Sequence, residues 1–177
     1  EYDDIRKWVQ DLVNGSYKIK NQRSKIRKPI VSRWETGIRY DLVGVNNQQD
    51  VVNYLDEIRL ATSIDISHKS NAQDDEAGNF LIAYTDRYAD ITRNPVIMDY
   101  LQLKYSAKVI KDKLPRILKI IDNANVRCFC FSSVDENGNF NYYIAIARRD
   151  VLNKGMESSE IVYQHILEGV VGLSIVD

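Results

Sequence analysis

The amino-acid sequence predicts a single α+β domain, and three observations carry that prediction. The chain has 177 residues, 44% hydrophobic and 28% charged, which is the balance of a folded domain with a sizeable core. Apolar residues recur at helical spacing in several segments, and two strand-like runs near the C-terminal end flank a short turn. We therefore expect residues 1–177 to form one unit with a mixed or antiparallel sheet packed against helices.

The first thirty residues predict a helix and a basic connector ahead of the core, residues 30–177. A helix is expected over residues 3–14, where Asn14-Gly15 ends it. Its apolar positions recur at i, i+3, i+4 and i+7: Ile5, Trp8, Val9 and Leu12. Residues 18–28 then hold six Lys or Arg, which indicates a solvated connector or a contact with an acidic partner.

Alternation and helical spacing place the elements of the core in order. Short strands are expected over residues 38–42, 64–67 and 80–84. A helix over residues 49–62 buries four apolar side chains: Val51, Val52, Leu55 and Ile58. The polar loop over residues 68–79 is expected to be mobile.

Two further helical segments are expected in the middle of the chain, over residues 97–103 and 106–123. Pro115 falls inside the second segment. Because proline removes a backbone donor and clashes with the preceding turn, we expect a kink or two abutting helices there.

A β-hairpin is the clearest local signal, with strands over residues 127–134 and 140–148 around an Asn137-Gly138 turn. This register places small residues together on one face, Cys128 and Cys130 opposite Ala147 and Ala145. It places bulky residues together on the other face, Phe129 and Phe131 opposite Ile146 and Ile144. Both faces are apolar, so we expect a covered sheet with a helix on the cysteine side.

The two cysteines lie on one face of a strand with Cα atoms about 6.5–7 Å apart, so a disulfide between them would be strained. A metal pair would need two further ligands that the sequence does not supply. Cysteine–histidine catalysis would need one of them exposed beside His165. We expect Cys128 and Cys130 to be small buried core residues.

The last predicted helix, residues 158–173, is capped by Ser158 or Ser159 and is apolar on a broad face. It invites comparison with the zinc motif HExxH, in which two histidines bind the metal and the glutamate acts as base. His165 stands at the first ligand position, but Ile166 replaces the base and Gly169 the second ligand. The sequence therefore contains no complete catalytic set.

His165 and Glu168 share a helix face and are the one weak candidate pair for a metal such as zinc. A core histidine with a satisfied hydrogen bond is the simpler interpretation, and we expect no bound cofactor. His68 lies in a distant polar loop. The acidic run Asp74-Asp75-Glu76 lacks the spacing of a calcium loop and is expected to be solvated.

Twenty-four basic and twenty-five acidic residues give a net charge of −1. This balance provides no reason to expect nucleic acid or an anionic membrane as a partner. No stretch approaches the roughly 20 apolar residues of a membrane span. The start without Met and the end after an apolar helix indicate a processed form or a fragment truncated at its C-terminus.

The run R-W-E-T-G-I-R-Y-D-L-V-G, residues 33–44, resembles the opening of bacterial domain-of-unknown-function family 2927. Residues 62–66 and 79–82 are similar to the segments that follow it there. The cysteine-bearing hairpin and residues 171–173 resemble the last block of that family. The resemblance covers roughly residues 30–85 and 125–173.

The resemblance implies a zincin-like fold, with a sheet packed against a buried, active-site-like C-terminal helix. It also implies export to the bacterial periplasm, envelope or exterior, with a lipid anchor upstream as one route. Because Ile166 and Gly169 depart from a catalytic motif, the favoured function is that of a pseudoenzyme that binds another protein. The alternatives are a metal-dependent hydrolase with a non-standard site at His165 and Glu168, and an immunity or inhibitor partner of a secreted toxin.

Overall fold

The computed structural model describes residues 32–71, 77–152 and 156–172. Three predicted features lie outside these residues: the helix over 3–14, the basic connector over 18–28 and the acidic run over 74–76. Within the described residues the chain is a mixed α/β fold with one five-stranded sheet.

The sheet has the strand order β2-β1-β3-β5-β4, and neighbouring strands are parallel except for β4, which runs antiparallel to β5. The strands are β1 (Ile38–Val43), β2 (Ile66–His68), β3 (Phe80–Thr85), β4 (Cys128–Val134) and β5 (Phe140–Arg148). The expected mixed sheet is confirmed. Parallel neighbours need crossover connections, and α3 (Gln48–Thr62) provides the one between β1 and β2.

The hairpin between β4 and β5 has the predicted register, with Cys128 opposite Ala147 and Cys130 opposite Ala145. The strand expected over residues 64–67 begins later, at Ile66. The reason is the end of α3: Ser63 adopts a left-handed conformation with φ 60°, and its N–H donates to the Arg59 carbonyl. The chain therefore becomes extended only after this cap.

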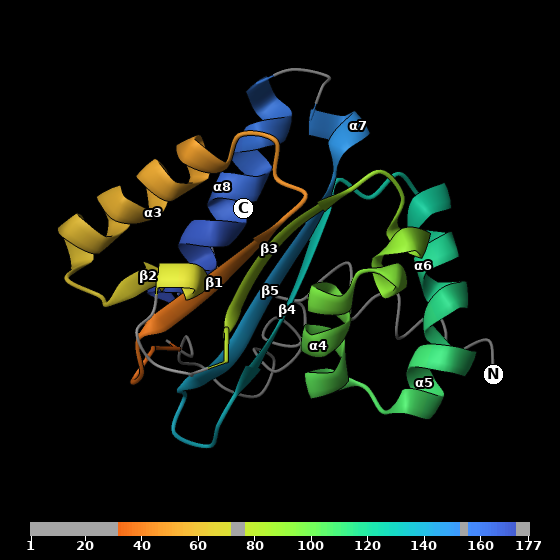
Figure 1. The fold of residues 1–177 in the computed structure, drawn as a ribbon, viewed down its shortest axis with the longest axis horizontal. Coiled ribbons are helices and arrows are strands. Elements are labelled where there is room, and N and C mark those ends of the chain that lie inside the picture. Colours follow the sequence, from red (N-terminus) through yellow and green to blue (C-terminus); the bar gives the residue numbers. More distant parts are fainter. Residues whose placement is uncertain (1–31, 72–76, 153–155, 173–177) are drawn as a thin grey trace, which may run out of the picture.

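Two layers of helices cover the sheet (Figure 1). α3 and α8 (Met156–Val171) lie on one face, and α4 (Pro95–Lys104), α5 (Ala107–Asp112) and α6 (Leu114–Asn123) lie on the other. Short pieces complete the chain: the 3₁₀ turns η1 (Lys69–Asn71) and η2 (Tyr88–Arg93) and the helix α7 (Arg149–Leu152). No helix in these described segments is both long and apolar enough to cross a membrane.

The break predicted at Pro115 is real. α5 ends at Asp112 and α6 begins at Leu114, so Pro115 lies in the first turn of α6, where a missing N–H costs nothing. The predicted start of the last helix is wrong, because α8 begins at Met156 and contains Ser158 and Ser159 instead of being capped by them. Met and Glu are good helix formers, so residues 156–157 extend the helix toward its N-terminus.

Each face of the sheet packs its own hydrophobic cluster. Phe129, Ile144 and Ile146 pack with the α4–α6 layer. On the opposite face, the small side chains of both cysteines and of Ala145 and Ala147 pack beneath α3 and α8. The alternation predicted for the hairpin is thus confirmed. Tyr142 and Tyr143 are buried in these clusters.

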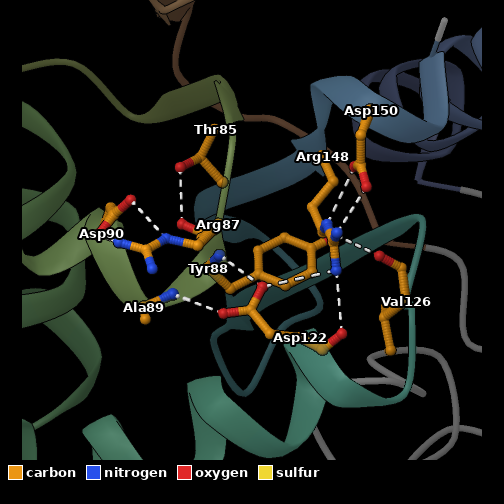
Figure 2. Close-up of polar contacts among 9 residues, drawn as sticks. All are labelled: Thr85, Arg87, Tyr88, Ala89, Asp90, Asp122, Val126, Arg148 and Asp150. Carbon is orange, nitrogen blue, oxygen red and sulfur yellow. Dashed lines mark hydrogen bonds and ion pairs between the residues drawn. The ribbon is translucent and has the colours of Figure 1, made fainter.

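A polar network around Asp122 ties the α4–α6 layer to the sheet, and Figure 2 shows how its members converge. The Asp122 carboxylate, at the end of α6, accepts hydrogen bonds from the backbone N–H groups of Tyr88 and Ala89 at 2.8 and 3.0 Å. It also lies 3.7 Å from the Arg148 guanidinium of β5. The Tyr88 hydroxyl donates to the Val126 carbonyl at 2.6 Å. This network joins η2, α6 and β5.

Candidate functional site

His165 of α8 lies beside Cys130 of β4. The Cys130 Sγ and His165 Nδ1 atoms are 3.4 Å apart, and a carboxylate oxygen of Glu168 lies 3.7 Å from the same Nδ1. The two α8 residues are three apart and share a helix face, as the sequence predicts. Cys130 is only 9% exposed, whereas the His165 and Glu168 side chains are 25% and 17% exposed. We call Cys130, His165, Glu168 and Tyr143 the thiol–imidazole cluster.

The imidazole of His165 carries a positive charge across the neutral range. Burial by itself lowers its pKa, because it disfavours the imidazolium. Hydrogen bonding to Cys130 and Glu168, together with their negative charges, outweighs burial and raises the pKa to about 10. Burial also raises the pKa of the neighbouring Cys128 thiol well above its ordinary value. A charged imidazole therefore lies in the same cluster as the neutral Cys128 thiol.

Tyr143 of β5 fills the space beside Gly169 of α8. A Cβ atom built on Gly169 would lie 2.6 Å from the Tyr143 ring, so only glycine allows this approach. The Trp34 indole N–H donates to the Gly169 carbonyl at 2.7 Å and holds the end of α8 in place. The position that a second histidine ligand would need is therefore occupied by a tyrosine ring.

The Tyr143 hydroxyl is buried and makes no hydrogen bond of ordinary geometry among the described residues, although it lies beside the Cys130 thiol. Burial raises the pKa of this phenol well above its ordinary value, and the charge of Cys130, hydrogen bonding to its thiol and the charge of Glu168 raise it further. A buried hydroxyl without a partner is costly and is uncommon in folded proteins. This weakly partnered donor is the most unusual feature of the cluster.

The arrangement limits the chemistry available. A triad needs its nucleophile and its orienting carboxylate on opposite ring nitrogens, whereas Cys130 and Glu168 both lie at Nδ1. Ile166, at the position of a base, is fully buried. No group of three or more His, Cys, Asp or Glu in the described ranges has the spacing of a metal site. His68 ends β2, at the opposite edge of the sheet from β4.

A second feature is an open groove of about 490 Å³ between α3 and α8. Both helices line it with residues spaced i, i+3, i+4 and i+7: Asp50, Asn53, Tyr54 and Glu57 from α3, and Glu160, Tyr163, Gln164 and Leu167 from α8. We call it the α3–α8 groove. It lies on a different side of α8 from His165 and Glu168.

The α3–α8 groove is acidic and aromatic. Three of its eight lining residues are carboxylates and none is Lys or Arg, so no cation of the lining offsets their charge. Tyr54 and Tyr163 meet edge to face at 4.7 Å between ring centroids. Burial, the neighbouring Tyr163 and then Glu57 raise the pKa of Tyr54, and burial and then Asp50 raise that of Tyr163. The carboxylates thus impose a negative potential on both rings.

The sequence predicts that His165 and Glu168 share a helix face, and it raises a cysteine beside His165 only as a condition for catalysis. It does not predict that Cys130 and Tyr143 lie against the two α8 residues. Their proximity depends on packing β4 and β5 beneath α8, which no local pattern encodes. The groove did leave a signal in the sequence. Each helix carries a second stripe, at the same spacing as its apolar stripe, that combines carboxylates with tyrosine. Such a stripe on two helices predicts a groove once those helices are known to be neighbours.

Comparisons with known proteins do not add to this picture. No protein-family model, no curated protein and no solved structure matches the chain. Any function assigned to the cluster or to the groove therefore has to be argued from the geometry of the described residues.

Proposed function

We propose that this chain is a non-catalytic, zincin-like binding domain that holds a basic segment of a protein partner in the α3–α8 groove. The observation that carries the proposal is the groove itself, in which carboxylates from two helices surround a pair of tyrosine rings. A concave site with aromatic walls and a few charged groups is the usual form of a binding site.

The state of α8 supports a non-catalytic role. Ile166 cannot accept a proton, and the Tyr143 ring occupies the space beside Gly169. Placing histidine at position 169 would require that ring to move. The zincin-like layout is itself part of the proposal, supported by the packing of the sheet against α8.

The chemistry of the partner follows from the groove's charge. Asp50, Glu57 and Glu160 line the groove and could each pair with a cationic side chain of the partner. Tyrosine faces attract Lys and Arg, and Arg most often. A segment with two or three Lys or Arg residues at helical or extended spacing would match the two carboxylate-bearing stripes. A partner in the bacterial envelope or exterior, including a secreted toxin, fits the setting that the sequence resemblance implies.

Peptide binding tests the proposal. A fluorescein-labelled Arg-rich peptide is titrated with the protein at low and at high salt, with an acidic peptide of equal length as the reference. We expect binding of the basic peptide alone, weakened by salt because the contacts are ionic. The double variant Glu57→Gln, Glu160→Gln should weaken it about tenfold, since each exposed pair contributes up to about 1 kcal/mol.

Glu136→Gln provides the matched control, because Glu136 is an exposed carboxylate at the tip of the hairpin. It should bind the peptide as the wild type does. Equal weakening by the control, or none by the double variant, would refute the groove as the binding site. Stoichiometric zinc in the purified protein that disappears in His165→Ala would instead favour the metal-dependent hydrolase.

A further inference from the structure

The thiol–imidazole cluster has a composition that the binding proposal does not use. Cys130 Sγ lies 3.4 Å from an imidazole nitrogen, and the imidazole is charged. Cysteine beside an imidazolium reacts as the thiolate, which is the nucleophilic form. We propose that Cys130 is a nucleophilic thiol for small hydroperoxides, with His165 as the adjacent proton donor and the Tyr143 hydroxyl binding the oxygen that sulfur acquires.

Tyr143 provides the second observation. Its hydroxyl is buried, makes no hydrogen bond of ordinary geometry within the described residues, and lies beside the Cys130 thiol, where it feels the charges of both Cys130 and Glu168. An oxygen atom on the Cys130 sulfur would give this donor a stronger acceptor than the thiol. The groups facing Cys130 thus come from three elements: Cys128 from β4, Tyr143 from β5, and His165 with Glu168 from α8.

Burial selects the class of substrate. Cys130 is 9% exposed, which excludes a peptide chain as its substrate and favours the smallest oxidants, such as hydrogen peroxide. Acyl transfer is further disfavoured because Cys130 and Glu168 approach the same imidazole nitrogen. Oxidation by a hydroperoxide needs neither a bound acyl group nor a proton relay through both ring nitrogens.

The step balances without any other reagent. The Cys130 thiolate attacks one oxygen of the hydroperoxide, an S–O bond forms, and the O–O bond breaks. The leaving hydroxide or alkoxide takes a proton, which the His165 imidazolium supplies, and departs as water or an alcohol. Sulfur is oxidised by two electrons to the sulfenic acid, and the peroxide is reduced by two.

Cys128 is not placed to resolve this product. It lies two residues away on the same face of β4, and a disulfide between such residues is strained. Burial also raises the pKa of its thiol and keeps it neutral. The sulfenic acid therefore either persists or reacts with a small thiol from outside the protein.

Trapping with dimedone tests the proposal. The reduced protein is treated with hydrogen peroxide in the presence of dimedone, and the adducts are located by peptide mass spectrometry. We expect the adduct on Cys130 to form at least about tenfold faster than on Cys128, since burial raises the pKa of the Cys128 thiol and Cys130 lies beside the imidazole. Tyr143→Phe keeps the ring but removes the donor, and should shorten the lifetime of the sulfenic acid measured by delayed addition of dimedone.

His165→Gln should slow the labelling of Cys130 about tenfold or more, with circular dichroism reporting whether the variant folds. If the variant does not fold, the ratio of Cys130 to Cys128 labelling in the wild-type protein still tests the proposal. Equal labelling of the two cysteines, or no adduct at peroxide levels that oxidise free cysteine, would overturn the proposal. Bound zinc whose removal is required for labelling would overturn it in favour of a metal site.

Discussion

The two faces of the sheet each carry one buried polar cluster, and the clusters differ in how completely their groups are partnered. In the Asp122 network, the carboxylate accepts from two backbone N–H groups and pairs with Arg148, and the Tyr88 hydroxyl has an acceptor (Figure 2). In the thiol–imidazole cluster, the Tyr143 hydroxyl makes no hydrogen bond of ordinary geometry within the described residues and has only the weakly accepting Cys130 thiol beside it.

This difference separates two roles of buried polar groups. A satisfied network fixes one arrangement of its elements, here η2 against α6 and β5. A cluster with a weakly partnered donor contributes less to stability but retains the capacity to bind an incoming atom. The following variants measure that contrast, from the largest expected effect to the smallest.

Asp122→Ala should have the largest effect. It leaves two backbone N–H groups without their acceptor and removes one of the two carboxylates beside the mostly buried Arg148, which keeps its pair with Asp150. We expect a cost of about 3 kcal/mol. The free energy of unfolding in urea measures this loss. Asp90→Ala, which removes a more exposed carboxylate of η2, is the control and should cost under about 1 kcal/mol. Similar losses in the two variants would show that the network is not the anchor of this layer.

The next largest effect should be the pH dependence of stability, which arises from His165 in the thiol–imidazole cluster. The folded-state pKa of His165 is raised from 6.5 to about 10, so the stability it provides is fully present below pH 6.5. That contribution is lost as the pH rises through about 10. Urea midpoints between pH 6 and about 10.5 should fall more in the wild type than in His165→Gln. Parallel curves for the two proteins would contradict the charged state of His165.

Removing the hydroxyl of Tyr88 or of Tyr143 should change the free energy of unfolding least, and comparing the two variants isolates the effect of a hydrogen-bond partner. Tyr88→Phe removes a hydroxyl that donates at 2.6 Å and leaves the Val126 carbonyl unpaired, at a cost of about 1 kcal/mol. Tyr143→Phe removes a buried hydroxyl that makes no hydrogen bond of ordinary geometry in the described part of the chain, and should be neutral or slightly stabilising. Unfolding midpoints of both variants, measured together, check this order. A larger loss for Tyr143→Phe would mean that its hydroxyl has an acceptor.

Local patterns predicted local structure well. The hairpin register followed from Asn137-Gly138 and from the alternation of small and bulky residues, and the structure has it residue for residue. Helix α3 and the division at Pro115 also followed from spacing and proline geometry. In each case the signal and the contacts that it determines lie within a few residues of one another.

The order of the strands and the composition of the candidate site were not predictable in the same way. β3 joins β5 as a parallel neighbour, with Ile82 opposite Ala145, and nothing near either residue specifies the other. Cys130 reaches His165 only because β4 occupies the edge of the sheet beneath α8. The sequence predicted that both cysteines are buried, which is confirmed, but it gave no sign that a buried Cys130 would contact His165.

The hairpin also has a consequence for how the chain folds. β4 with β5 is the one strand pairing in the described sheet that closes a short loop, whereas β1–β2, β1–β3 and β3–β5 each join distant parts of the chain. Because the entropy of closing a loop rises with its length, the hairpin can form first and at low cost. β5 would then offer a preformed edge to β3, and the parallel strands would be added from that edge outward.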